Sequence, residues 1–185
     1  MPTTRQARQS RTASTQKIAT GAKIVPTFWF EKDAPEAANF YASIFPDSHV
    51  DQVIPMAADS PSGPAGSVVT VEFTLAGQPF IAFHAGPLDP FNHAISLTVN
   101  CADQDEIDHF WDALGDGGTH EPCGWLKDRY GVSWQIVPTA LQDMMRDPNK
   151  ERAKRVTEAM LEMKKLDIAE LERAYEGRGS STTGR

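Results

Sequence analysis

The pattern of apolar and polar positions predicts a mixed fold of strands and helices. Residues 24–30 are typical of a strand, and residues 34–44 carry an apolar stripe at helical spacing. Segments 49–56, 67–75 and 79–84 then favour short strands, because apolar and polar residues alternate most clearly along the second of them. The predicted order of elements is therefore β-α-β-β-β.

The same order starts again in the second half of the chain. The segment KIVPTFWFEKDAPEAANFY (23–41) aligns without a gap on HAISLTVNCADQDEIDHFW (93–111). The alignment places Asp33 on Asp103, each between a predicted strand and a helix that it would cap. This agreement predicts a duplicated module. The predicted fold class is α+β, with two βαβββ modules forming an incomplete barrel around a cleft, where a ligand is expected.

The second copy continues with predicted strands over 94–99, 121–126 and 132–137, and the chain beyond Pro138 turns to helix with narrow apolar stripes. These helices are expected to lie against the sheet or against a second subunit. The predicted organisation is a disordered extension at 1–21, a first module at 22–90, a second module at 91–138, C-terminal helices at 139–177 and a disordered tail at 178–185.

Composition and charge narrow the class of protein. The 185 residues are 40% apolar and 23% charged, and their net charge of −7 argues against a nucleic-acid partner. No apolar run reaches the roughly 18–20 residues that cross a bilayer, so no membrane partner is expected. Cys101 and Cys123 are expected as free thiols in the cytoplasm, with a single bridge as the alternative.

The first twenty residues have a composition of their own. They contain four basic residues, Arg5, Arg8, Arg11 and Lys17, and no acidic residue. They lack the apolar core of a secretory signal, so export is not expected. A disordered extension is the first interpretation, and an organelle transit peptide is the alternative.

Three stretches carry a resemblance to a known family: FNHAISLTVNCADQDEIDHFW, a Gly-Gly pair followed by CGWLKDRYGVSWQIVP, and RAKRVTEAMLEMKKLDIAELERAY. Over about residues 22–177 the chain resembles the PhnB-like branch of the vicinal oxygen chelate (glyoxalase/bleomycin resistance/dioxygenase) superfamily. The resemblance implies a glyoxalase-like fold and a homodimer. The branch often carries the label 3-demethylubiquinone-9 3-methyltransferase, but the sequence has no glycine-rich GxGxxG turn of a nucleotide-binding frame.

The resemblance also implies where a metal would bind. Metal-dependent members place His, Gln or Glu on the first and last strands of each module. Those positions correspond here to Pro26 or Thr27, Ile81, Ser96 and Gln135. Only Gln135 can coordinate, and as a weak neutral ligand, so no metal and no other cofactor are predicted. The alternative is a divalent metal held by His84 and Gln135, with or without a residue of a partner chain.

Strand alternation selects candidate ligand-binding residues. Ser96 and Thr98 share one face of 94–99, and Ser133 and Gln135 share one face of 132–137. These polar faces are expected to line the cleft. The opposite faces, with Ile95, Leu97, Val99 and Trp134, are expected to form the core.

The hairpin of the second module supplies the other candidates. Trp125 is expected to form an aromatic wall for a planar ligand. Lys127 and Asp128 would either pair in solvent or hold an acidic substrate, and Arg129 has the same two interpretations. Cys123 is either a nucleophile or a small buried thiol.

These residues predict a protein that binds a small polar or aromatic molecule, with lyase- or isomerase-like turnover left open. Gln135, Ser96 and Cys123 are the catalytic candidates, and Ser96, Thr98 and Gln135 could polarise a carbonyl without a metal. Two alternatives remain: a metal-dependent lyase, isomerase or dioxygenase of the glyoxalase type, and a resistance protein that acts by sequestering its ligand.

Overall fold

The computed structural model describes residues 22–178, which form two compact units. The first comprises residues 22–42 and 46–86, and the second comprises residues 43–45 and 87–178. The predicted extension at 1–21 lies outside the described residues, as does the predicted tail beyond Arg178.

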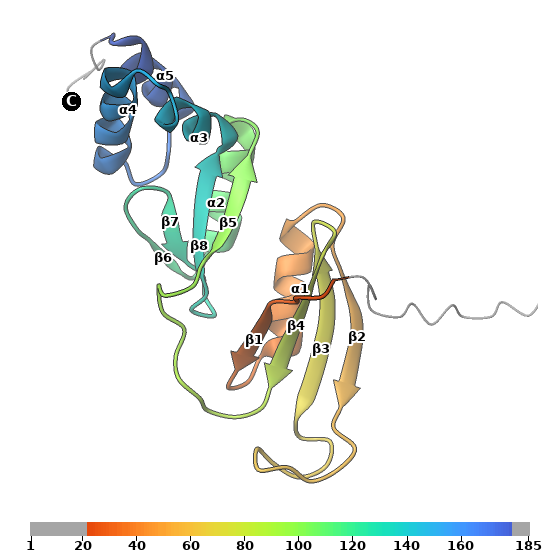
Figure 1. Cartoon of the computed structure of the whole chain (residues 1–185). Helices are drawn as coiled ribbons and strands as arrows, with labels where there is room; N and C mark the ends of the chain where they lie inside the picture. The colour runs from red at the N-terminus through yellow and green to blue at the C-terminus, as the bar shows by residue number, and fades with distance from the viewer. Residues whose placement is uncertain (1–21, 179–185) are drawn as a thin grey trace, which may run out of the picture. The chain divides into compact units, whose positions relative to one another are not determined.

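The first unit is a helix against a four-stranded sheet (Figure 1). Its elements are β1 (Thr27–Phe30), α1 (Ala34–Ile44), β2 (His49–Pro55), β3 (Val69–Leu75) and β4 (Gln78–His84). The sheet order is β1-β4-β3-β2, in which β1 runs parallel to β4 and the other neighbours are antiparallel. The sheet remains open at both edges and does not close into a barrel.

An aromatic cluster forms the core of this first unit. Phe28 stacks on Phe80 with ring centroids 5.8 Å apart, and Phe80 stacks on Phe73 at 5.5 Å. Helix α1 contributes Tyr41 to the cluster, and Ala37 is also fully buried. The small Ala37 side chain allows the helix to approach the sheet closely, so the apolar faces of strand and helix predicted from the sequence meet.

The second unit repeats the same topology. Its elements are β5 (Leu97–Cys101), α2 (Gln104–Gly115), β6 (Thr119–His120), β7 (Trp125–Lys127) and β8 (Ser133–Pro138). The order is β5-β8-β7-β6, and β5 is parallel to β8 as β1 is to β4. The prediction of an α+β fold built from two βαβββ modules is therefore confirmed.

Three predicted details differ from the structure. The predicted strand 121–126 is replaced by two short strands, Thr119–His120 and Trp125–Lys127, with a turn between them. The first strand of the second module begins at Leu97 rather than at residue 94, and Ile95 is 71% exposed, so its predicted core position is wrong. The reason is that pairing with β8 starts only at Leu97, opposite Trp134. The aligned aspartates also differ: Asp103 caps α2 by accepting from the Glu106 amide at 2.9 Å, whereas Asp33 has a positive φ of 71°.

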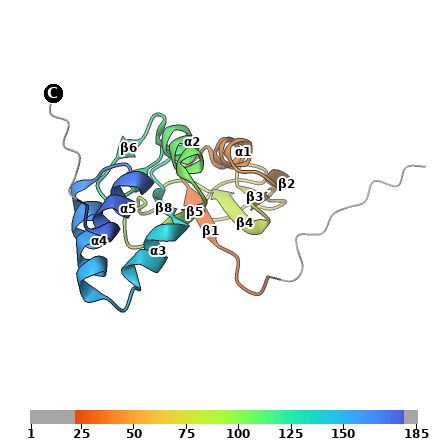
Figure 2. The ribbon, with the colours of Figure 1, turned by 90° about the horizontal axis from the view of Figure 1, so that it is seen from above.

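Three further helices complete the second unit, α3 (Thr139–Met145), α4 (Lys150–Glu162) and α5 (Ile168–Glu176) (Figure 2). Buried Leu141, Val156, Leu166 and Leu171 form their shared core, and Met144, Met160 and Met163 pack around it. These three methionines therefore contribute to the packing of the helices. No helix within residues 22–178 has the length and apolar character needed to cross a membrane.

Candidate functional site

A cavity of about 330 Å³ lies in the second unit, where the sheet meets the C-terminal helices. The sheet and the loop before β7 contribute one wall, and helices α3 and α4 contribute the other. The lining residues share the property of being uncharged; they are Thr98, Cys123, Trp125, Gln135, Val137, Leu141, Gln142, Met145 and Met160. Four of the sequence-predicted residues, Thr98, Cys123, Trp125 and Gln135, are thus brought together.

The register of the sheet explains why three of these residues are neighbours. Thr98 on β5 pairs with Gln135 on β8, and Trp125 on β7 pairs with the same Gln135. Paired residues of adjacent strands project to the same side of a sheet, so the three side chains form a row on one face. The other face carries Trp134 and Ile136, which are buried, as the alternation predicts.

A hydrogen bond positions the amide of Gln135. Its Nε2 donates to Ser96 Oγ at 2.9 Å. With the amide nitrogen engaged in this way, the Oε1 oxygen is the group of Gln135 that can accept a hydrogen bond from a ligand. Ser96 does not line the cavity, and its role in the structure is to orient Gln135.

Backbone contacts hold Cys123 at the cavity. The Cys123 amide donates to the Met163 carbonyl at 2.8 Å, and the Gly124 amide donates to the Lys164 carbonyl at 2.7 Å. Gly124 has a φ of 80°, and a Cβ there would lie 2.7 Å from the Ile136 carbonyl, so this close approach needs glycine. The segment after α4 is thereby fastened to the loop before β7.

The second cysteine has a different environment. Cys101 is fully buried at the end of β5, and burial, reinforced by the nearby carboxylates of Glu106 and Asp103, raises the pKa of its thiol to about 12. A thiol with so high a pKa is a poor nucleophile at neutral pH. Cys123 is therefore the cysteine that can meet a ligand, and both thiols are free, as the sequence predicted.

The helical wall contains residues that the sequence did not single out as site residues. Leu141, Gln142 and Met145 come from α3, and Met160 comes from α4. Gln142 Nε2 also donates to Asn100 Oδ1 at 3.1 Å, a bond that ties α3 to β5. The apolar stripes predicted these helices, but they did not predict which side chains would border a cavity.

Asp128 has a structural role in the hairpin between β7 and β8. Asp128 is only 4% exposed. Its carboxylate accepts hydrogen bonds from the Tyr130 amide at 2.8 Å, the Val132 amide at 3.1 Å and the Trp134 indole nitrogen at 2.8 Å. The carboxylate thus fixes the turn and anchors the buried indole. It does not line the cavity.

The remaining predicted polar residues also lie away from the cavity lining. Arg129 pairs with the Asp116 carboxylate, and its Nε donates to the Asp116 carbonyl at 3.0 Å. Lys127 lies opposite Ser133 in the ladder between β7 and β8. Ser133 is 1% exposed, and its hydroxyl has no hydrogen-bond partner within residues 22–178.

The residues at the implied metal positions do not fit a divalent cation. In the first unit Thr27 lies beside Ile81, and in the second unit Gln135 bonds to Ser96. A side-chain set of threonine, isoleucine, serine and glutamine offers neither carboxylate nor imidazole. Across the described part of the chain no three His, Cys, Asp or Glu side chains group as metal ligands would. His84 ends β4 in the first unit, whereas Gln135 belongs to β8 in the second.

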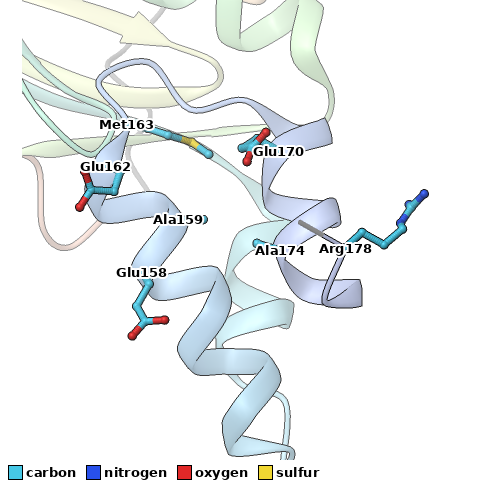
Figure 3. A pocket seen from close by; sticks show the side chains of 7 residues that line it. All are labelled: Glu158, Ala159, Glu162, Met163, Glu170, Ala174 and Arg178. Atoms are coloured by element: carbon cyan, nitrogen blue, oxygen red, sulfur yellow. The ribbon is translucent and has the colours of Figure 1, made fainter. Parts of the chain in front are cut away.

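A larger hollow of about 570 Å³ lies between α4 and α5 (Figure 3). Helix α4 presents Glu158, Ala159 and Glu162 to it, and α5 presents Glu170 and Ala174. Glu170 already pairs with Arg173. Although this hollow is larger, it contains none of the strand residues with candidate chemistry, so the smaller cavity is the better candidate site.

Comparison with known proteins identifies the relatives of the chain. Residues 22–137 match the family model described as 3-demethylubiquinone-9 3-methyltransferase. No curated protein matches the chain. The match ends immediately before α3, so the helical wall of the cavity lies outside it.

One solved structure with a TM-score above 0.5 shows the same fold, and two more distant ones are similar in part. A PhnB protein from Bacillus cereus, described as a 3-demethylubiquinone-9 3-methyltransferase, is 34% identical, with 64% of this chain and 100% of that chain covered and a TM-score of 0.56. Protein PA1353 from Pseudomonas aeruginosa is 21% identical (63% and 97% covered, TM-score 0.49). The fosfomycin resistance protein FosX from Listeria monocytogenes is 12% identical (63% and 90% covered, TM-score 0.41). The Bacillus cereus structure and the family match support the predicted PhnB-like fold.

Proposed function

The chain belongs to the 3-demethylubiquinone-9 3-methyltransferase (PhnB-like) family, and from this premise we propose that its second unit binds a small organic molecule in the 330 Å³ cavity. The observation that carries the proposal is the convergence of Thr98, Trp125 and Gln135 on one face of the sheet, opposite apolar residues of α3 and α4. The volume is at the small end of the roughly 300–1,000 Å³ typical of small-molecule sites.

The chemistry of the lining favours binding over turnover. Thr98 and Gln135 can hydrogen-bond to a ligand, and Trp125 can stack on a flat ring. Neither a carboxylate nor a histidine is among the lining residues, so the cavity itself offers no ordinary general acid or base. The proposed function is therefore ligand binding, and no catalytic step is assigned.

A screen of small molecules by thermal shift tests the proposal. A ligand at 100 times its Kd should raise the free energy of unfolding by about 2.7 kcal/mol. For a chain of this size that corresponds to a Tm increase of about 5–10 °C. The Gln135→Ala and Trp125→Ala variants should lose the increase, whereas Gln78→Ala, an exposed glutamine of β4 in the first unit, should keep it. A hit that the cavity variants leave unchanged would contradict the proposal.

Thermal shift also tests whether the chain binds the cofactor of a methyltransferase, as the family description suggests. S-adenosylmethionine is the methyl donor expected of such a methyltransferase, and we expect it to leave the Tm unchanged, since two βαβββ modules differ from the doubly wound frame with a glycine-rich turn. If S-adenosylmethionine raised the Tm, methyl transfer would become the better proposal for the function.

We also propose a cytoplasmic homodimer, on the basis of the family resemblance. Strand β2 lies at the edge of the first sheet, and the large apolar side chains of Val53, in β2, and Met56, just after it, are exposed. This exposure is consistent with an edge that a second subunit covers. Analytical ultracentrifugation of the full chain should give twice the 20.3 kDa monomer mass.

A further inference from the structure

We propose that the ligand of the 330 Å³ cavity is an uncharged aromatic carboxamide or lactam, an inference that rests on the proposed binding function and names its ligand class. Three properties of the lining carry it: the absence of charge, a matched donor and acceptor side by side, and a polarisable apolar remainder.

Charge comes first. All nine lining residues are uncharged. An ionised ligand would lose part of its hydration on entry without meeting a counter-charge, which weakens its binding. A neutral ligand avoids this cost, so the lining selects against carboxylates, phosphates and ammonium groups.

The neighbouring charged groups are engaged elsewhere. Asp128 serves the hairpin amides and the Trp134 indole, and Arg129 pairs with Asp116. His93, whose ring lies 5.9 Å from that of Trp125, contacts the Glu121 carboxylate at 2.7 Å. Arg146 reaches the edge of the site, where its Nη2 donates to Gln142 Oε1 at 3.4 Å.

The second property is a hydrogen-bond donor and an acceptor side by side in the lining. Thr98 and Gln135 are register partners on adjacent parallel strands. The Gln135 amide uses one of its two N–H groups on Ser96, which fixes the orientation of the amide; its carbonyl oxygen can accept, and the neighbouring Thr98 hydroxyl can donate. The complementary ligand presents an N–H and a C=O next to each other. A primary carboxamide or a lactam has this pair, whereas an ester or ketone lacks the donor.

The third property is that the other lining side chains are apolar and polarisable. Cys123, Met145 and Met160 contribute sulfur atoms, which make favourable contacts with aromatic rings, and Trp125 offers a flat face. The volume of 330 Å³ is about twice the ~150 Å³ of an engineered cavity that binds benzene. The cavity therefore suits a ligand with one or two fused rings.

A matched set of two-ring probes tests the inference by isothermal titration calorimetry on the full chain at pH 7.5. We expect 2-naphthamide to bind at least tenfold more tightly than 2-naphthoate, its ionised counterpart. N,N-dimethyl-2-naphthamide, which keeps the carbonyl but lacks the N–H, should bind about tenfold more weakly than 2-naphthamide, since one unmatched hydrogen bond corresponds to about 1.4 kcal/mol.

Variants connect the selectivity to named side chains. Thr98→Val, which preserves shape, should weaken 2-naphthamide binding, and Arg146→Gln should leave the preference for the neutral probe unchanged. Gln142→Lys, which adds a cation to the lining, should shift the preference toward 2-naphthoate. The Tm of each unliganded variant serves as the folding control.

The outcomes separate this inference from the proposed function. If 2-naphthoate binds as tightly as 2-naphthamide, the ligand class is wrong and the binding function stands. If no probe binds while other screened molecules bind in a manner sensitive to Gln135→Ala, the ligand class is again wrong. If no molecule in the screen responds to the cavity variants, the proposed function and this inference fail together.

Discussion

Replacing Asp128 tests whether one buried carboxylate holds the second module together. Asp128→Ala would leave the Val132 amide and the Trp134 indole nitrogen without their acceptor in buried surroundings, and the Tyr130 amide in a half-buried one. A hydrogen bond to a charged group contributes about 1.5–3 kcal/mol. Since water can reach the Tyr130 amide, the two fully buried donors dominate, and we expect a loss of about 3–5 kcal/mol.

Urea denaturation followed by both circular dichroism and tryptophan fluorescence would measure this loss as a change in the free energy of unfolding. Asp128→Asn should cost less, because it keeps one acceptor oxygen. Asp116→Asn is the matched control: its carboxylate is 74% exposed and pairs with Arg129 at the surface, so its loss should cost less than about 1 kcal/mol.

A double-mutant cycle isolates the bond to the indole. Trp134→Phe removes the N–H donor that lies 2.8 Å from Asp128 Oδ2. Combined with Asp128→Asn, it should cost less than the sum of the two single changes, by about 1–2 kcal/mol. If Asp128→Ala cost no more than the Asp116 control, the carboxylate would not be the anchor of the hairpin and this reasoning would be refuted.

Three other predictions follow from single residues. Gly118→Ala would place a Cβ 2.1 Å from the carbonyl oxygen of Lys127 on β7, so it should lower the Tm by several degrees in a thermal melt, and an unchanged Tm would contradict this backbone contact. In the native protein a disulfide reagent at pH 8 should label Cys123 and spare Cys101, whose buried thiol has a pKa of about 12; denaturant should release the second equivalent, and Cys101→Ser should remove only that one. Burial, and secondly the Asp51 carboxylate, raise the pKa of Glu72 above 4.5. The native state therefore keeps this proton to a higher pH than the unfolded state, so the free energy of unfolding should fall as pH rises above 4.5. Glu72→Gln should flatten that part of the profile of unfolding free energy against pH.

The duplicated fold was predictable because its signals are local. Alternation along 67–75 and the helical stripe of 34–44 depend only on neighbouring residues, and β3 and α1 are found there. The misplaced start of β5 shows where local signals end. Ile95 fits the apolar alternation, but whether it pairs depends on the register with β8, a strand that follows it by about forty residues.

The strand side of the candidate site was predictable from the sequence, and the helical side was not. Strand alternation placed Thr98 and Gln135 on the same polar face, which the register of β5 and β8 then brought together. The sequence predicts Asp128 either in a solvated pair or at an acidic substrate, because its neighbours give no sign that the Trp134 indole would use its carboxylate. Met145 and Met160 could not be assigned, because a narrow apolar stripe does not tell core from cavity wall.

The position of the C-terminal helices has an evolutionary consequence. The sheet side of the cavity lies within residues 22–137, which the family shares, whereas Leu141, Gln142, Met145 and Met160 lie beyond them. A relative that matches only the shared portion would have positions equivalent to Thr98 and Gln135 without these four partners. Substitutions in α3 and α4 can therefore change ligand preference while the inherited sheet stays as it is, and two members of the family can diverge in what they bind without diverging in fold.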